Sequence, residues 1–266
     1  MPPRWPEIFF ARSKGNGEEL PLYGRAVGIG VAFLLLALIF CFAFSRLQYG
    51  WDWGAVYQYR HKFLTGWLVT LAISAAALVA SLIIGLCAAL SQRSAFLPLR
   101  YLGKIYIELI RGTPLLVQIL VFFYVVADAF GIGNRYLVGA LTLALFAGSY
   151  ISEIIRAGIE SVGESQLESA RAIGLTMRQT YRYVIFPQVM RRILPPLAGQ
   201  FASLIKDSSL LSIIAVNEFT LNAQEVNAFT YSTMESYLPL AVGYLALTLP
   251  ISMLSRHLER RYRYAS

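Results

Sequence analysis

The segment with the clearest chemistry places a cation, an anion and two hydroxyl groups inside an apolar run. The stretch Ile193 to Val216 is interrupted by Lys206, Asp207, Ser208 and Ser209. Charged side chains at membrane depth are costly, so they face a cavity or pair with another charge. Asp207 suits an ammonium group, and Lys206, or the dipole of a helix starting near Ser209, suits a carboxylate. The pattern predicts either a pathway for zwitterions or a structural pair that joins Lys206 and Asp207 to each other or to Glu218.

A second polar group lies in the apolar stretch Ile105 to Ala127. Its candidates for the substrate pathway are Arg111, Thr113 and Gln118. Pro114 interrupts the helical hydrogen-bond ladder there, which suits a kink lining a pathway. Gln118 follows Arg111 by seven residues and lies near the same helical face. It either lines the pathway or has a purely structural role. For Arg111, a pair with Glu108 at the inner membrane interface is the favoured interpretation.

Glu153 and Arg156 form a third polar pair, three residues apart at the end of the apolar stretch Leu137 to Ile155. Side chains three apart are neighbours on a helix surface. We expect a structural or gating pair.

The longest polar segment between the apolar runs is Glu168 to Pro187, ESARAIGLTMRQTYRYVIFP. A helix is predicted from Glu160 to Ile173, where Gly174 can end it in a left-handed conformation. A second helix is predicted to begin near Thr176 and to meet Pro187. Ser169 and Ala170 are small enough to let another surface approach closely, so the loop is expected to dock on a soluble partner. The alternative is a solvated hairpin stabilised by local pairing between its acids and Arg171.

The apolar stretches around these groups set the class of protein. Hydrophobic residues make up 57% and charged residues 14% of the 266 residues, and mean hydropathy is +0.56. These values predict a polytopic, all-helical membrane protein. About 20 apolar residues cross a bilayer, and on that measure the chain has about six crossings. They are Ala26 to Phe44, Thr65 to Leu90, Ile105 to Ala127, Leu137 to Ile155, Ile193 to Val216 and Tyr237 to Leu254.

The basic residues of the loops indicate the orientation. The net charge is +8, but the basic residues lie in short loops, so they report topology and not nucleic acid binding. Most of them fall on one side if the N-terminus is inside, and positive residues favour the cytoplasmic side. We therefore expect both termini and the Glu168 to Pro187 loop to be cytoplasmic.

These motifs resemble those of permease subunits of bacterial binding-protein-dependent ABC importers. The loop carries Glu168, Ser169 and Ala170, then Gly174, and nine residues later Val184-Ile185-Phe186-Pro187, at the family's spacing; Ser, Val and Phe replace the usual Ala, Ile and Leu. Three further stretches resemble the polar amino acid branch with its histidine, glutamine and arginine permeases: ELIRGTPLLVQ at 108–118, YISEIIRAGIESV at 150–162 and IKDSSLLSIIAVNEF at 205–219.

The resemblance implies a domain organisation. Residues 1–25 are expected to form a cytoplasmic arm and 26–64 an extra transmembrane helix with an outer loop. Residues 65–260 are expected to form the five-helix core of a type I ABC importer, with a cytoplasmic coupling loop at 158–190, and 261–266 a cytoplasmic tail.

The same resemblance implies a function. The chain is expected to move polar amino acids across the inner membrane by alternating access, with an ATPase subunit docking through Glu168, Ser169, Ala170, Gly174 and Pro187. The implied partners are an ATPase dimer, a second permease copy or paralogue, an extracytoplasmic solute-binding protein and the lipid bilayer.

The chain has no GxxxxGK[S/T] phosphate loop, so any ATP hydrolysis needs a separate subunit. We therefore predict a transporter subunit and not an enzyme. No cofactor and no metal ion are expected on this chain, and ATP and Mg would enter through the partner. The alternative in another class is an ion-coupled secondary amino acid transporter, in which the intramembrane charges serve as a relay.

Overall fold

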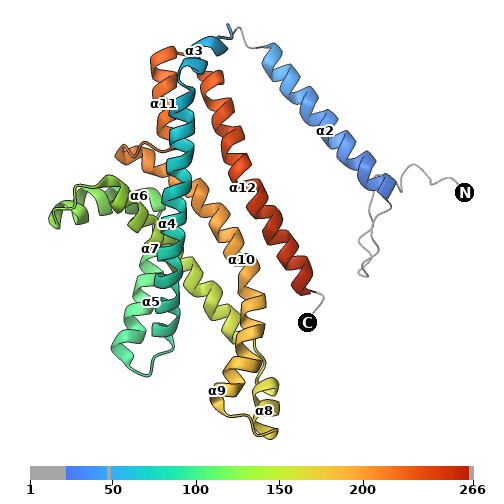
Figure 1. The fold of residues 1–266 in the computed structure, drawn as a ribbon, viewed down its shortest axis with the longest axis vertical. Helices are drawn as coiled ribbons and strands as arrows, with labels where there is room; N and C mark the ends of the chain where they lie inside the picture. Colours follow the sequence, from blue (N-terminus) through green and yellow to red (C-terminus); the bar gives the residue numbers. More distant parts are fainter. Residues whose placement is uncertain (1–21, 47–48, 264–266) are drawn as a thin grey trace, which may run out of the picture. The chain divides into compact units, whose positions relative to one another are not determined.

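The computed structural model describes residues 22–46 and 49–263. Most of the expected N-terminal arm, residues 1–21, and the last three residues of the expected tail lie outside this range. Contacts divide the chain into two units, 1–51 and 52–266. The described residues are almost entirely helical, as the composition predicts (Figure 1).

The first unit contains one long helix, α2 (Leu22–Ser45). Its side chains are mostly exposed and apolar, so α2 is suited to lipid contact, as expected for the extra crossing. In its last turn, the ring of Phe44 stacks on that of Trp51, which follows the helix, with centroids 6.1 Å apart.

The second unit is built on two long helices that pack along each other, α4 (Arg60–Gln92) and α7 (Arg135–Glu160). Small residues bring them close together. A Cβ atom added at Gly85 would lie 2.6 Å from Cγ2 of Ile151, and one added at Gly148 would lie 2.9 Å from Cγ2 of Ile84. Close approach through small residues is how membrane helices gain packing energy.

The predicted third crossing is sharply bent. It consists of α5 (Leu97–Gly112), α6 (Leu115–Val121) and the π-helix η1 (Phe122–Ala127), with a 110° bend between α5 and the α6–η1 pair. Pro114 interrupts the helix as expected, but the change of direction is much larger than a kink in one straight span. Arg111 and Gln118 therefore do not share one helical face.

The predicted fifth crossing also differs from a helix broken in its middle. The helix α10 (Phe186–Asp207) is continuous through Lys206 and Asp207 and then tightens into the 3₁₀-helix η3 (Ser208–Ile214). After η3, Ala215 adopts a left-handed conformation with φ 56°. A short α11 (Phe219–Thr230) follows, and α12 (Thr233–Arg263) forms the last predicted crossing.

Four described helices are long and apolar enough to span a membrane, or five if the bent α5–α6–η1 segment counts as one. The helix α10 is not among them, because charged and polar residues such as Arg191 and Arg192 lower its hydropathy. A buried core joins α4, α6, α7, α10 and η3 through side chains that include Ile73, Ile119, Leu143, Leu204 and Leu211.

Candidate functional site: the α7–α10 loop and a charged network

The loop between α7 and α10 is a helical hairpin. The predicted helix from Glu160 to Ile173 is interrupted, because α7 ends at Glu160 and α8 (Glu164–Ala172) begins after Gly163. Ser161 and Gly163 are poor helix formers, which explains a break that the spacing pattern did not reveal. The hairpin then turns back through Gly174 into α9 (Met177–Thr180).

Gly174 ends α8 as predicted. Its φ is +78°, a conformation that glycine adopts without a steric penalty. The N–H of Gly174 donates to the carbonyl oxygen of Arg171 at 2.9 Å, and that of Leu175 donates to the carbonyl oxygen of Ala170 at 3.0 Å. These two bonds form a complete Schellman motif, so the tight turn is specified by local backbone chemistry.

The second arm of the hairpin starts at Thr176, as predicted. The hydroxyl of Thr176 accepts from the N–H of Gln179, whose side chain accepts from the N–H of Thr176, which makes a capping box. The helix reaches Pro187, as predicted, and continues beyond it. The chain runs without interruption through α9, the π-helix η2 (Tyr181–Ile185) and α10, with Pro187 in the first turn of α10. The π-helical turn of η2 lies directly before Pro187 and is wider than an α-helical turn. An α-helical turn there would clash with the proline ring and would lack one hydrogen bond, because the proline nitrogen carries no hydrogen.

The two faces of α8 differ in exposure. Glu168 and Ser169 are exposed, whereas Ala170 is only 3% exposed. Two large apolar side chains beside the turn, Ile173 and Met177, are 76% and 60% exposed. The hairpin thus presents polar and apolar groups together on a surface that the described chain does not cover.

Two polar contacts attach the hairpin to the base of α10. The side-chain amide of Gln188 donates to the side-chain oxygen of Gln166 in α8, and the guanidinium of Arg192 donates to the carbonyl oxygen of Ser161. The sequence analysis did not identify these residues, because the partners of each pair lie far apart in the sequence.

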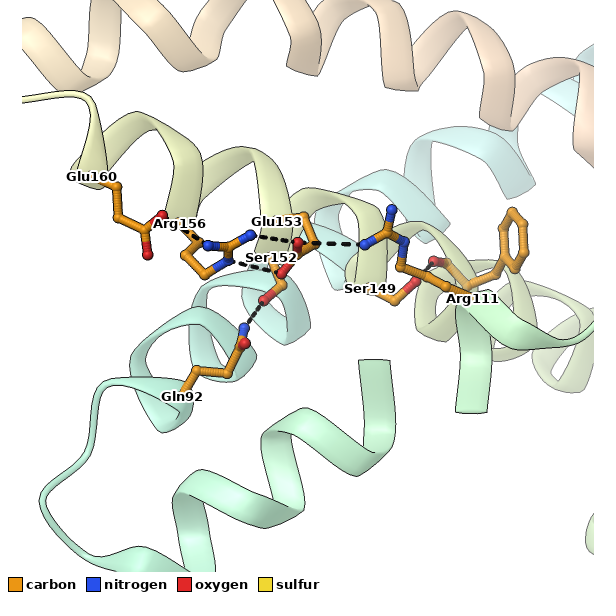
Figure 2. Close-up of polar contacts among 8 residues, drawn as sticks. Gln92, Arg111, Ser149, Ser152, Glu153, Arg156 and Glu160 are labelled. Carbon is orange, nitrogen blue, oxygen red and sulfur yellow. Dashed lines mark hydrogen bonds and ion pairs between the residues drawn. The ribbon is translucent and has the colours of Figure 1, made fainter. Parts of the chain in front are cut away.

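The C-terminal ends of α5 and α7 carry a charged network (Figure 2). Arg156 donates two hydrogen bonds to the Glu153 carboxylate, at 3.1 Å from Nε and 2.8 Å from Nη2. Its Nη1 also contacts Glu160 at 2.7 Å, and Nη1 of Arg111 lies 3.4 Å from the same Glu153 carboxylate. The expected pair of Glu153 and Arg156 is therefore present, but it belongs to a larger network.

Arg111 belongs to this network and not to a pair with Glu108. Its guanidinium approaches Glu153 of α7 and lies 5.2 Å from the centroid of the Tyr150 ring. Within the described chain, no ion pair joins Arg111 to Glu108. The favoured local interpretation was wrong, because packing of α5 against α7 supplies a nearer carboxylate.

Gln118 and Thr113 brace the bend between α5 and α6. Nε2 of the buried Gln118 donates to the carbonyl oxygen of Ile110 at 2.6 Å, to the carbonyl oxygen of Thr113 at 3.1 Å and to the Thr113 hydroxyl at 2.9 Å. These carbonyl groups lie at the end of α5, where helical partners are missing. The geometry supports the structural interpretation of Gln118.

Lys206 and Asp207 lie at the last turn of α10, with Lys206 exposed, Asp207 half-buried and Ser208 buried. No ion pair connects Lys206 to Asp207 or to Glu218 among residues 22–46 and 49–263. The Ser208 hydroxyl donates to the carbonyl oxygen of Ile205 at 2.8 Å. The structural pairing considered for these charges is therefore not formed.

Glu218 instead organises a buried polar centre. Its carboxylate accepts from the N–H groups of Thr220 at 2.9 Å and Leu221 at 2.8 Å and caps α11. It also accepts from the hydroxyl of Tyr244 at 2.8 Å and from that of Thr70 at 3.4 Å. Glu218 lies outside the candidate spans, and burial raises the pKa of its carboxyl group, partly offset by these hydrogen bonds. The sequence showed Glu218 only as a possible partner of Lys206.

Sequence comparison identifies the family. Residues 77–264 match the family model described as the inner membrane component of binding-protein-dependent transport systems. The chain belongs to this family. The match begins inside α4, so α2 precedes it. The protein is thus a multi-pass membrane permease component.

Individual relatives agree with the family match. The chain is similar to the glutamine transport system permease protein GlnP of Escherichia coli (strain K12), with 35% identity over 214 residues, covering 80% of this chain and 98% of the relative. It is also similar to the L-cystine transport system permease protein TcyB of Bacillus subtilis (strain 168), with 36% identity over 212 residues, covering 79% and 90%. Both names describe transport system permeases, and neither names an ion-coupled transporter.

Solved structures show the same fold. A crystal structure of an amino acid ABC transporter with histidines is 36% identical, with a TM-score of 0.74, and the match covers 80% of this chain and 100% of that chain. An inward-facing structure of the MetNI methionine ABC transporter has a TM-score of 0.63 at 15% identity, which supports the type I importer fold alone.

Proposed function

We propose that this permease moves polar amino acids into the cell and is driven by a separate ATPase that docks on the α7–α10 hairpin. The observation that carries the proposal is the hairpin itself. Its turn is specified by the Schellman motif at Gly174, and its exposed face combines Glu168 and Ser169 with apolar Ile173 and Met177. A surface of this composition suits a protein partner better than solvent.

The mechanism is alternating access. ATP and Mg bind the partner ATPase dimer, and closure of that dimer shifts α8. Because α9, η2 and α10 form one uninterrupted helix, the movement reaches Lys206 and Asp207 at its other end. The network of Arg111, Glu153 and Arg156 gates the inner ends of α5 and α7 during this change.

The substrate class follows from the charges at the end of α10 and from the names of the relatives. Asp207 binds the ammonium group of an amino acid, and Lys206 binds its carboxylate. Their free side chains are suited to this role, since neither forms an ion pair within the described chain. The relatives named for glutamine and L-cystine transport support the same class.

The assembly contains a second permease copy or a paralogue, as two-fold symmetry favours, and an extracytoplasmic solute-binding protein. The distribution of Lys and Arg supports an orientation with both termini in the cytoplasm of a bacterial cell.

Affinity purification of the tagged chain from its native membrane tests the proposal. An ATPase subunit should accompany the native chain, be lost with Glu168→Lys, and remain with Glu259→Lys, an equal charge change at an exposed position of α12. A chain that purifies alone and still catalyses uptake into vesicles without ATP would overturn the proposal.

A further inference from the structure

A cavity of about 610 Å³ opens where α4, α5 and α7 approach one another, beside the charged network. Its lining carries more positive than negative charge. The basic side chains are Arg93, Arg100, Lys104, Arg111 and Arg156, and the acidic ones are Glu108, Glu153 and Glu160.

The charges on the α7 side of the cavity are already paired. Glu153 and Glu160 contact Arg156, and Glu153 also contacts Arg111. The opposite side is different. In the described part of the chain Arg93 and Arg100 form no ion pair, and Lys104 only approaches the Tyr101 ring, with its Nζ 5.9 Å from the ring centroid. The cavity thus retains unpaired cations, opposed by Glu108 as the only unpaired acid among its lining residues.

The helix α5 shows what kind of anion fits these cations. Arg100, Lys104 and Glu108 follow one another at four-residue intervals and share one face. The adjoining face carries Leu97, Tyr101 and Ile105, which are 57%, 58% and 55% exposed. An unpaired basic stripe therefore runs directly beside an uncovered apolar surface.

We propose that this cavity binds the phosphate of an anionic phospholipid, with the acyl chains lying along the apolar face of α5. The phosphate contacts Arg93, Arg100 and Lys104, and the chains contact Leu97, Tyr101 and Ile105. Basic pockets between membrane helices select acidic headgroups, and the long aliphatic stems of arginine and lysine reach from an apolar surface to a charged group. A soluble phosphate would use the same cations but leave the apolar face uncovered, which favours the lipid.

Native mass spectrometry of the full chain, purified with the subunits that remain bound, tests this inference. Phosphatidylglycerol, phosphatidylcholine and inorganic phosphate are the three probes. We expect phosphatidylglycerol to bind in preference to phosphatidylcholine. Its affinity should fall roughly five-fold for each cation removed, thus about 25-fold in Arg100→Gln/Lys104→Gln.

Two control variants keep the test specific. Arg256→Gln/Arg260→Gln removes two exposed charges of α12 that do not line the cavity, and it should bind phosphatidylglycerol normally. Arg100→Lys retains the charge and should retain most of the binding.

Equal binding of both lipids, or unchanged phosphatidylglycerol binding in Arg100→Gln/Lys104→Gln, would overturn the inference. Inorganic phosphate that displaces the lipid at equal concentration would identify a soluble anion as the ligand and would also overturn it. Neither result bears on the ATPase docking tested at Glu168.

Discussion

Gln118 reaches back across the bend between α5 and α6, and its amide nitrogen lies 2.6 Å from the carbonyl oxygen of Ile110. One side chain thereby replaces the hydrogen bonds that the backbone loses where Pro114 stops the helix. The bend of 110° is consequently a specified shape, because changing it would break this hydrogen bond to the carbonyl oxygen of the buried Ile110.

The first prediction concerns this brace. Gln118→Leu keeps a similar volume but removes the donor, so the carbonyl oxygen of the buried Ile110 loses this hydrogen bond. The loss should be about 1–3 kcal/mol, visible as a lower midpoint in thermal unfolding. Gln200→Leu is the control, since Gln200 is half-buried in α10 and makes no side-chain hydrogen bond within the described residues. An equal midpoint for both variants would contradict the assignment.

The second prediction concerns pH. Burial raises the pKa of Glu218 above its ordinary value of 4.5, so the folded state binds this proton more tightly than the unfolded state. Stability from this site is therefore full below about pH 4.5 and falls as pH rises toward the raised pKa. The unfolding midpoint of the native chain should therefore fall relative to that of Glu218→Gln, which cannot ionise, as pH increases over this range. Glu259→Gln, at an exposed site, should follow the native chain, and a native midpoint that rises relative to Glu218→Gln would refute the prediction.

The third prediction separates backbone strain from crowding at Gly174. A Cβ atom there would meet nothing within 4 Å, so a substitution is limited by the positive φ alone. Asparagine visits this conformation readily, and a β-branched residue does not. We expect Gly174→Asn to keep uptake near the native rate, and Gly174→Val to lose about 1–2 kcal/mol of local stability and most of its uptake. Uptake assays with equal amounts of each variant in the membrane test this prediction. Equal uptake by the two variants would show that coupling does not depend on the conformation of this turn.

The fourth prediction concerns the close contact of α4 and α7. Gly85→Leu places side-chain atoms where Ile151 already lies, so the helices must separate. Overpacking of this kind costs about 1–3 kcal/mol. Gly28→Leu in α2, where a Cβ atom meets nothing within 4 Å, should leave the unfolding midpoint of the second unit unchanged. If Gly85→Leu unfolds at the same temperature as Gly28→Leu, the contact does not limit stability.

Local features of the fold were predictable because they depend on neighbouring residues. The long apolar runs located most helices, Gly174 located the end of α8, and Thr176 located the start of the next helix. Pro114 indicated an interruption, yet its angle depends on Gln118 folding back, which no local pattern encodes. The sequence placed Pro187 on this helix but did not reveal the π-helical turn that precedes it.

The polar site was less predictable, because its partners come from different helices. Arg111 has an acid three residues before it in the sequence, but tertiary packing brings Glu153 closer. Glu218 was visible as an acid after an apolar run, while its donors from α4 and α12 were not. Sequence spacing gives the neighbours on one helix, and it does not give those across an interface.

The uninterrupted helix from Met177 to Asp207 also has a mechanical consequence. At 1.5 Å of rise per residue, it forms a rod roughly 45 Å long. A tilt of about 10° at the hairpin end would displace the Lys206 end by about 8 Å if the rod pivots as a rigid body. Under the proposed docking of an ATPase on the hairpin, a helix of this length would convert a small rotation of the hairpin into a displacement at Lys206 larger than an amino acid headgroup.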